Sequence, residues 1–91
     1  MTEQNSVEIC IGGVLASATA IEIATTLGSC VAVCLYDNTN RVGGMNHFSL
    51  PGDGPSGDTR YGGTAIRMLV ARIVELGGQR QRLLAKVFGG G

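Results

Sequence analysis

The sequence predicts an α/β fold of the α+β kind, a mostly antiparallel sheet sandwich with one main helix. Three observations support this class. Five stretches alternate apolar and polar residues or are apolar throughout, as β-strands are. One stretch, residues 59–76, repeats apolar side chains at the spacing of an amphipathic helix. The 91 residues are enough for one small domain and too few for two, so residues 1–91 are expected to form a single domain.

The expected strands follow one another along the chain, with the helix between the fourth and the fifth. They cover residues 7–11, 20–26, 30–36, 42–50 and 83–88. The third, CVAVCLY, is apolar throughout and rich in valine, which is typical of a strand covered on both faces. The turn DNTN joins it to the fourth in the best-marked hairpin. Several strands are apolar on both faces, and one helix cannot cover both faces of their sheet. This predicts either oligomerisation or further C-terminal layers that this chain lacks.

The composition excludes several classes of protein. Seven basic and seven acidic side chains cancel, so there is no basic field to attract nucleic acid or an anionic membrane. The longest apolar run is far shorter than the ~20 residues of a membrane span. The first residues, MTEQNSVE, lack the shape of a signal peptide, so a soluble cytoplasmic protein is expected. Three cysteines and one histidine, without metal-binding spacing, predict neither a disulfide framework nor a zinc site.

The register of the hairpin predicts that Cys30 faces the chain's only histidine, His47. Directly paired residues of an antiparallel hairpin have a constant sum of residue numbers. A two-residue loop at residues 38–39 pairs Asp37 with Asn40. The same sum pairs Cys30 with His47. Their Cβ atoms would then lie ~4.5–5.5 Å apart on one face of the sheet.

A cysteine beside a histidine suits nucleophilic catalysis, because the imidazole takes the thiol proton and the thiolate attacks. The turn at Gly28 and Ser29 adds backbone N–H groups that can hold a developing oxyanion. The same histidine would return a proton to a leaving ammonia or amine. The alternative is structural: a cysteine on an apolar strand is usually inert, and a lone histidine is usually core or surface. Cys10 and Cys34 are expected to be structural, because neither has an imidazole partner.

A glycine-rich stretch, residues 52–57, matches the G-x-G-x-x-G pattern of dinucleotide-binding loops. That motif requires a parallel βαβ unit and an acidic residue on the strand that follows. Here the preceding strand is antiparallel, Pro55 interrupts the loop, and Glu75, the nearest acidic candidate, falls inside the helix. The stretch is therefore expected to be a mobile loop and not a phosphate site.

The motifs around these residues resemble the CheD family of chemoreceptor glutamine deamidases. They are LGSCVAVCLYD, GGMNHFSLP with its histidine seventeen positions after the cysteine, RYGGTAI, LVARIVELGG and RLLAKVFGG, in that order. The resemblance implies an α/β sandwich that hydrolyses the side-chain amide of selected glutamines on methyl-accepting chemotaxis receptors. It implies Cys30 as the nucleophile and His47 as the general base and acid. It also implies no cofactor and, besides the receptor, a CheC-type phosphatase as a protein partner.

Two features depart from the family pattern. The family's third catalytic-site residue is a threonine six positions before the cysteine, where this chain has Ala24. Thr25 and Thr26 are the substitutes, and strand alternation favours Thr26 as the one on the right face. Family members also continue past the last glycines, so the chain is expected to cover only the N-terminal part of the family domain. An alternative function follows, that of a catalytically impaired member that binds a chemotaxis phosphatase or a receptor.

Overall fold

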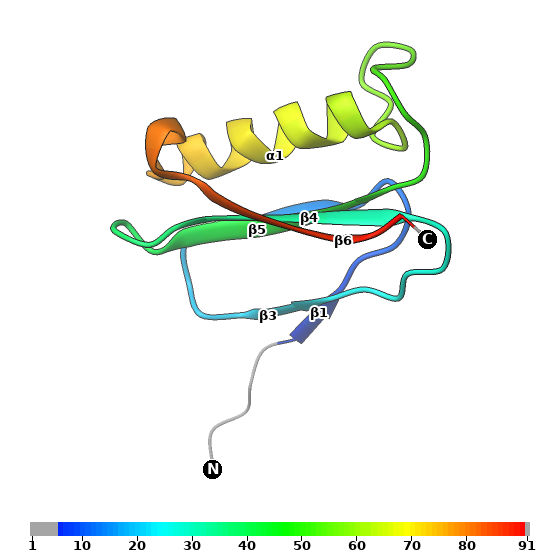
Figure 1. Cartoon of the computed structure of the whole chain (residues 1–91). Helices are drawn as coiled ribbons and strands as arrows, with labels where there is room; N and C mark the ends of the chain where they lie inside the picture. The colour runs from blue at the N-terminus through cyan, green and yellow to red at the C-terminus, as the bar shows by residue number, and fades with distance from the viewer. Residues whose placement is uncertain (1–5, 91) are drawn as a thin grey trace.

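Three layers make up the structure, a computed structural model that describes residues 6–90 (Figure 1). Helix α1 covers one face of a four-stranded sheet, and a two-stranded sheet lies across the other face. The elements are β1 (Ser6–Glu8), β2 (Val14–Ser17), β3 (Glu22–Ala24), β4 (Val31–Asp37), β5 (Val42–Phe48), α1 (Gly62–Glu75), the 3-10 helix η1 (Arg80–Arg82) and β6 (Leu84–Gly89). The predicted α+β class with one main helix is confirmed for the described residues. No helix in that part of the chain is long and apolar enough to cross a membrane.

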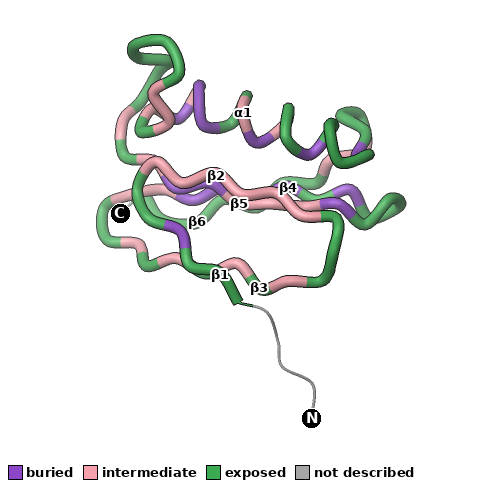
Figure 2. The backbone as a smooth tube through the Cα atoms, turned by 180° about the vertical axis from the view of Figure 1, so that it is seen from behind, coloured by how far each residue is buried: buried purple, intermediate pink, exposed green. Residues whose placement is uncertain are grey.

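The hydrophobic core lies between α1 and the four-stranded sheet, in which the strand order is β2-β5-β4-β6 and every neighbouring pair is antiparallel. Leu69 and Ile73 of α1 are fully buried one helical turn apart, as the 3.6-residue period predicts. They pack on the sheet face that carries Val33, Leu35 and Val42. Figure 2 shows buried positions along this contact. Each large apolar side chain that is removed from water here contributes about 1.5–3 kcal/mol.

Helix α1 begins at Gly62, three residues after the predicted start at residue 59. The residues before it are held in a turn, in which the Arg60 N–H donates to Asp58 Oδ1 at 3.1 Å. That aspartate therefore organises the approach to the helix, and no side chain caps the helix at Tyr61. The C-terminal end is close to the prediction, because Gly77 adopts the left-handed conformation, with φ of 103°, that ends a helix.

One strand was not predicted: β2 pairs with β5 along the edge of the four-stranded sheet. Its four residues, VLAS, directly follow two glycines and are too few to show a clear alternating pattern. The first and second predicted strands are shorter than expected, at Ser6–Glu8 instead of 7–11 and at Glu22–Ala24 instead of 20–26. They pair with each other in parallel and form the layer opposite α1.

The β4–β5 hairpin has a four-residue loop, residues 38–41, and not the predicted two-residue loop. Asp37 therefore pairs with Val42, and every pair along the hairpin shifts by two positions. The Asp37 carboxylate holds the wider loop, because it accepts the N–H groups of Thr39 and Asn40 at 3.0 and 3.1 Å. A shift of two residues leaves each side chain on its predicted face, whereas a shift of one would have reversed the faces.

Candidate active site

The predicted direct opposition of Cys30 and His47 is wrong, and the two residues are diagonal neighbours. His47 pairs with Ala32 in the β4–β5 ladder. Cys30 lies one residue before β4, and the Gly90 N–H donates to its carbonyl at 3.0 Å, which continues the strand pairing. Strand alternation places Cys30 on the same face as Ala32 and His47. Diagonal neighbours on one face are ~7–8 Å apart, a separation still within reach of the longer side chains.

The imidazole of His47 is held at one ring nitrogen, and the described part of the chain offers no partner to the other. The residue is only 4% exposed. Its Nδ1 lies 2.8 Å from Thr25 Oγ1, and the Thr25 hydroxyl donates to the carbonyl oxygen of Ile9 at 2.7 Å. Its Nε2 is buried and has no hydrogen-bond partner among residues 6–90. Buried polar atoms normally have partners, so this nitrogen is the natural candidate for a chemical role.

Thr25, and not Thr26, supplies the hydroxyl that reaches the imidazole. Strand alternation favoured Thr26, but β3 ends at Ala24, so alternation does not extend to either threonine. The segment is fixed instead by the Ile9 N–H, which donates to the Ala24 carbonyl at 2.9 Å. Thr26 lies nearby and lines a pocket together with His47. The hydroxyl that contacts the imidazole therefore lies five positions before Cys30, whereas the family pattern places it six positions before the cysteine.

Two pockets flank the Thr25–His47 contact between the two sheets. One has a volume of about 360 Å³ and is lined by Glu8, Ile9, Cys10, Ile11, Thr26 and His47. The other has a volume of about 330 Å³, and Ile23, Leu27, Met45 and Phe88 supply most of its apolar wall. Thr25 lines this second pocket and gives it a hydroxyl. One pocket therefore adjoins the imidazole itself, and the other adjoins the threonine that contacts it.

The two other cysteines lie in different settings. Cys10 is exposed and lines the pocket beside His47, a proximity that strand patterning did not predict. Cys34 is half-buried and pairs with Met45. Burial raises the pKa of the Cys34 thiol, and the charge of Lys86 lowers it in part. Within residues 6–90, no three histidine, cysteine or acidic side chains come together as metal ligands.

The turn before Cys30 does not depend on its glycine. Gly28 is not among the glycines with positive φ, and a Cβ at this position meets no atom within 4 Å. Ser29 follows it as a second bent residue. The glycine is therefore not required to shape this turn. The oxyanion-holding role of the two N–H groups stays a prediction.

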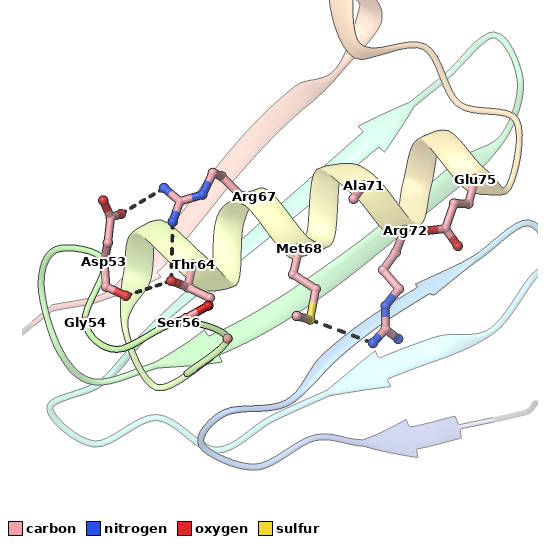
Figure 3. Close-up of a pocket in the computed structure, with 10 residues that line it drawn as sticks. Asp53, Gly54, Ser56, Thr64, Arg67, Met68, Ala71, Arg72 and Glu75 are labelled. Atoms are coloured by element: carbon pink, nitrogen blue, oxygen red, sulfur yellow. Dashed lines mark hydrogen bonds and ion pairs between the residues drawn. The ribbon is translucent and has the colours of Figure 1, made fainter.

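A larger pocket, of about 530 Å³, lies on the outer face of α1, away from His47 (Figure 3). The glycine-rich loop forms one of its sides. Arg67 and Asp53 form an ion pair at 2.8 Å, and the Thr64 hydroxyl donates to the Asp53 carbonyl at 2.7 Å. The Asp53 carboxylate lies against the first turn of the helix. A phosphate bound there would meet a like charge, so this loop is poorly suited to a dinucleotide.

Similarity to known proteins identifies the family. Residues 49–91 match the family model of CheD, described as CheD chemotactic sensory transduction. Over 95 aligned residues, the chain is 45% identical to a protein of Shewanella oneidensis named "Probable chemoreceptor glutamine deamidase CheD 1", and the alignment covers 98% of this chain. The chain belongs to the CheD family. The resemblance carried by its motifs is thereby confirmed.

Further CheD proteins show the similarity over a shorter stretch. Over 74 residues, the chain is 50% identical to proteins of Burkholderia mallei and Burkholderia pseudomallei, each named "Probable chemoreceptor glutamine deamidase CheD", and 75% of the chain is covered. The chain spans 46% of the Shewanella CheD protein and 32% of each Burkholderia CheD protein. It therefore spans less than half the length of these curated relatives.

Proposed function

We propose that the chain carries the catalytic centre of a protein-glutamine deamidase that acts on methyl-accepting chemotaxis receptors, with Cys30 as nucleophile and His47 as general base and acid. The names of its CheD relatives support the activity and the substrate. One observation carries the proposal. The His47 imidazole is oriented by Thr25, and its Nε2 has no hydrogen-bond partner among the described residues. Strand alternation puts His47 on the same face as Cys30.

The first half of the reaction forms a thioester. Nε2 of His47 accepts the proton of the Cys30 thiol, and the thiolate attacks the carboxamide carbon of the glutamine. The N–H groups at Gly28 and Ser29 stabilise the oxyanion that forms. His47 then gives the proton to the departing nitrogen, and ammonia leaves.

The second half releases the product with the same histidine. Nε2 of His47 takes a proton from a water molecule, and the resulting hydroxide attacks the thioester carbon. The Cys30 sulfur leaves and recovers its proton, and the glutamate side chain is freed. One water enters and one ammonia leaves for each glutamine converted. The chain and water supply every group that this cycle uses.

Ammonia release from a receptor cytoplasmic domain tests the proposal. The wild-type protein should release ammonia and convert glutamine to glutamate, which mass spectrometry of receptor peptides detects. Cys30→Ala should release none. Cys34→Ala is the matched control, because it removes a thiol from β4 without touching the proposed nucleophile, and it should keep the activity. Deamidation by the Cys30→Ala protein at the wild-type rate would sink the Cys–His mechanism.

We further propose the cytoplasm as the site of action and a CheC-type phosphatase as a second partner. One observation favours a role in binding. Strand β6 is an outer strand of its sheet, and its Leu84, Val87 and Phe88 side chains are exposed. Apolar edge strands are prone to pair with other polypeptides. The alternative function, a non-catalytic module that binds the phosphatase or the receptor, rests on this same edge.

Binding of a purified CheC-type phosphatase tests this alternative. Wild-type protein and the Cys30→Ala variant should bind equally, because the edge does not include the thiol. Val87→Lys should weaken binding, because a charge on an edge strand opposes strand pairing. Equal binding by the Val87→Lys variant would show that the phosphatase does not use β6.

A further inference from the structure

Three pockets follow one another along the face of β5 that carries His47. Their walls include Gly43, Met45 and His47, in that order along the strand. Alternate residues of a strand share one face, and at the usual rise Gly43 and His47 are about 13 Å apart. The pocket at Gly43 has a volume of about 460 Å³ and also includes Tyr36, Arg41 and the β2–β3 connection. We call it the Arg41 pocket.

The charge of the Arg41 pocket is positive. Arg41 is the only charged residue that lines it in the part of the chain that the structure describes. The residue is exposed, and its guanidinium forms no ion pair with any of residues 6–90, whereas three other arginines each pair with an aspartate. The acidic residue nearest in sequence, Asp37, is buried and already bonded to its own loop, to Gln79 and to Arg82. The pocket therefore has a cation and no acid of its own among the described residues.

The backbone at Arg41 does not call for an arginine. Its φ is 56°, in the left-handed region that glycine adopts without strain. Among residues 6–90 it is the only residue other than glycine with a positive φ. Such conformations in residues with a Cβ are strained and tend to occur at functional sites. The side chain, and not the turn, is thus the part of Arg41 that has a use.

Tyr36 and two hydroxyls complete the wall of the pocket. A Cβ at Gly43 would lie 2.5 Å from Cδ1 of Tyr36, so the tyrosine ring lies across the glycine and takes the space of a side chain there. On the opposite rim, Thr19 Oγ1 lies 3.0 Å from Ser17 Oγ. A hydroxyl proton can rotate toward a new acceptor, so Thr19 can donate to a bound anion.

We propose that the Arg41 pocket binds the carboxylate of an acidic side chain of the receptor substrate while the target glutamine reaches Cys30 and His47. The guanidinium fork matches the two oxygens of a carboxylate. One arginine also balances one carboxylate charge, whereas a phosphate carries about two. The identity of the substrate rests on the proposed function. The carboxylate site itself is measurable without the reaction.

The row of pockets sets the spacing between the two substrate side chains. A separation of about 13 Å corresponds to about four residues of an extended segment or about nine residues of a helix. The acidic side chain should therefore lie within about ten residues of the glutamine that is converted. This places the specificity of the site at the β4–β5 loop, at the far end of the sheet face from the thiol.

NMR of the full chain with Cys30→Ala tests the pocket, with poly-glutamate as the probe because its side chains carry only carboxylates. Poly-glutamate should shift the side-chain signals of Arg41 and Tyr36. Arg41→Gln should remove the shift at Tyr36. Arg72→Gln is the matched control and should keep it, because Arg72 also lacks an ion pair among residues 6–90 but lies on the outer face of α1.

Two results of this titration would overturn the proposal. No shift at Arg41 and Tyr36 would show that the pocket does not take a carboxylate. Equal shifts with inorganic phosphate, at the same concentration of charge, would show a site for free anions and not for an acidic side chain.

Deamidation of a receptor cytoplasmic domain tests the role in substrate recognition. Arg41→Gln should raise KM by about fivefold, the upper range for an exposed ion pair, and leave kcat unchanged. Arg41→Lys should have a smaller effect, because it keeps the charge and loses the fork. Arg72→Gln should keep the wild-type KM.

Changes in the receptor identify the partner of Arg41. Alanine in place of the acidic side chains within about ten residues of the converted glutamine should raise the KM of the wild-type protein by the same factor. The same receptor should leave the KM of Arg41→Gln unchanged, because the contact is already lost. A wild-type KM for Arg41→Gln would overturn the proposal. Poly-glutamate binding by a protein that does not deamidate receptors would support the carboxylate site and count against the proposed function alone.

Discussion

Thr25 Oγ1 lies 2.8 Å from Nδ1 of His47, and this contact joins two layers of the protein. Thr25 directly follows β3, and Ile9, the acceptor of its hydroxyl, directly follows β1. His47 belongs to β5 in the four-stranded sheet. The small parallel sheet therefore does more than cover the face opposite α1 (Figure 1), because the chain that leaves it orients the only imidazole.

The Thr25 hydroxyl should matter for turnover and not for substrate binding. Thr25→Val should lower kcat for ammonia release by about 100-fold, because displacement of a catalytic group by about 1 Å has an effect of this size. KM should change little, since the threonine orients the base without binding the substrate. Thr25→Ser should restore most of the activity. Initial rates with a receptor domain measure both constants, and a Thr25→Val protein with wild-type kcat would contradict this role.

Cys30 and His47 should behave as one catalytic unit. His47→Gln should lower the rate by about 10²- to 10⁴-fold, which is the usual contribution of a general base. Cys30→Ala should remove activity altogether. The double variant should be no worse than Cys30→Ala alone, because a base has no effect once its nucleophile is gone. Rates from single and double variants give this comparison, and independent, additive losses would show that the two residues do not act together.

The two remaining cysteines should differ in reactivity. Burial raises the pKa of Cys34, so less of it is thiolate near neutral pH, and the thiolate is the reactive form. Exposed Cys10 should therefore be alkylated by iodoacetamide faster than Cys34 in the folded protein. Peptide mapping by mass spectrometry measures each rate. The two rates should converge in denaturant, and equal rates in the folded protein would rule out the effect of burial.

Sequence patterns identified the parts of this fold that depend on apolar side chains. The spacing of apolar residues, Leu69 and Ile73 among them, predicted the buried stripe of α1, and the apolar runs predicted the central hairpin. Register was not predictable in the same way. The register depends on whether the hairpin loop has two or four residues. The four-residue loop forms because the Asp37 carboxylate accepts hydrogen bonds from two loop N–H groups, and the hydrophobic pattern is the same for either loop length.

The candidate site was predicted only in part, for a related reason. Side chains such as Cys30 and His47 can be recognised by residue type, and the motifs of the family point to them. The choice of Thr25 over Thr26 depends on where β3 ends, which is among the least predictable features of a sequence. The Ile9 carbonyl is a backbone group that every residue carries, so no residue pattern could have indicated it.

Gly44 should be far less replaceable than Gly28. A Cβ at Gly44 would press on the Leu15 carbonyl oxygen and lie 2.7 Å from Leu69 Cδ1, between β2 and the core. Gly44→Ala should therefore destabilise the fold by about 1–3 kcal/mol, as overpacking does. Gly28→Ala, with open space around its Cβ, should change stability by less than about 1 kcal/mol. Urea unfolding compares them, and equal losses would refute the steric argument.

The Asp37 carboxylate should make stability depend on pH in acid. It is fully buried and accepts the Gln79 N–H at 2.8 Å, and it also receives bonds from its own loop and from Arg82. These bonds, that of Gln79 first, lower its pKa from the ordinary 3.8 to about 2. Because the pKa is lower in the folded state than in the unfolded state, its contribution is complete above about pH 4 and is lost as the pH falls toward about 2.

Urea unfolding between about pH 5 and pH 2 measures this loss. Asp37→Asn should be less stable at neutral pH and should lose less stability on acidification. The Asp58 pKa, which Arg60 lowers to about 2, contributes in the same window, so the pH dependence should shrink without vanishing. Asp53→Asn is the matched control, because its exposed ion pair with Arg67 should contribute little. Protonation of Asp37 in acid removes the stability that its ionised carboxylate contributes. If Asp37→Asn retained the full pH dependence of the wild type, the carboxylate would not be the anchor of the hairpin loop.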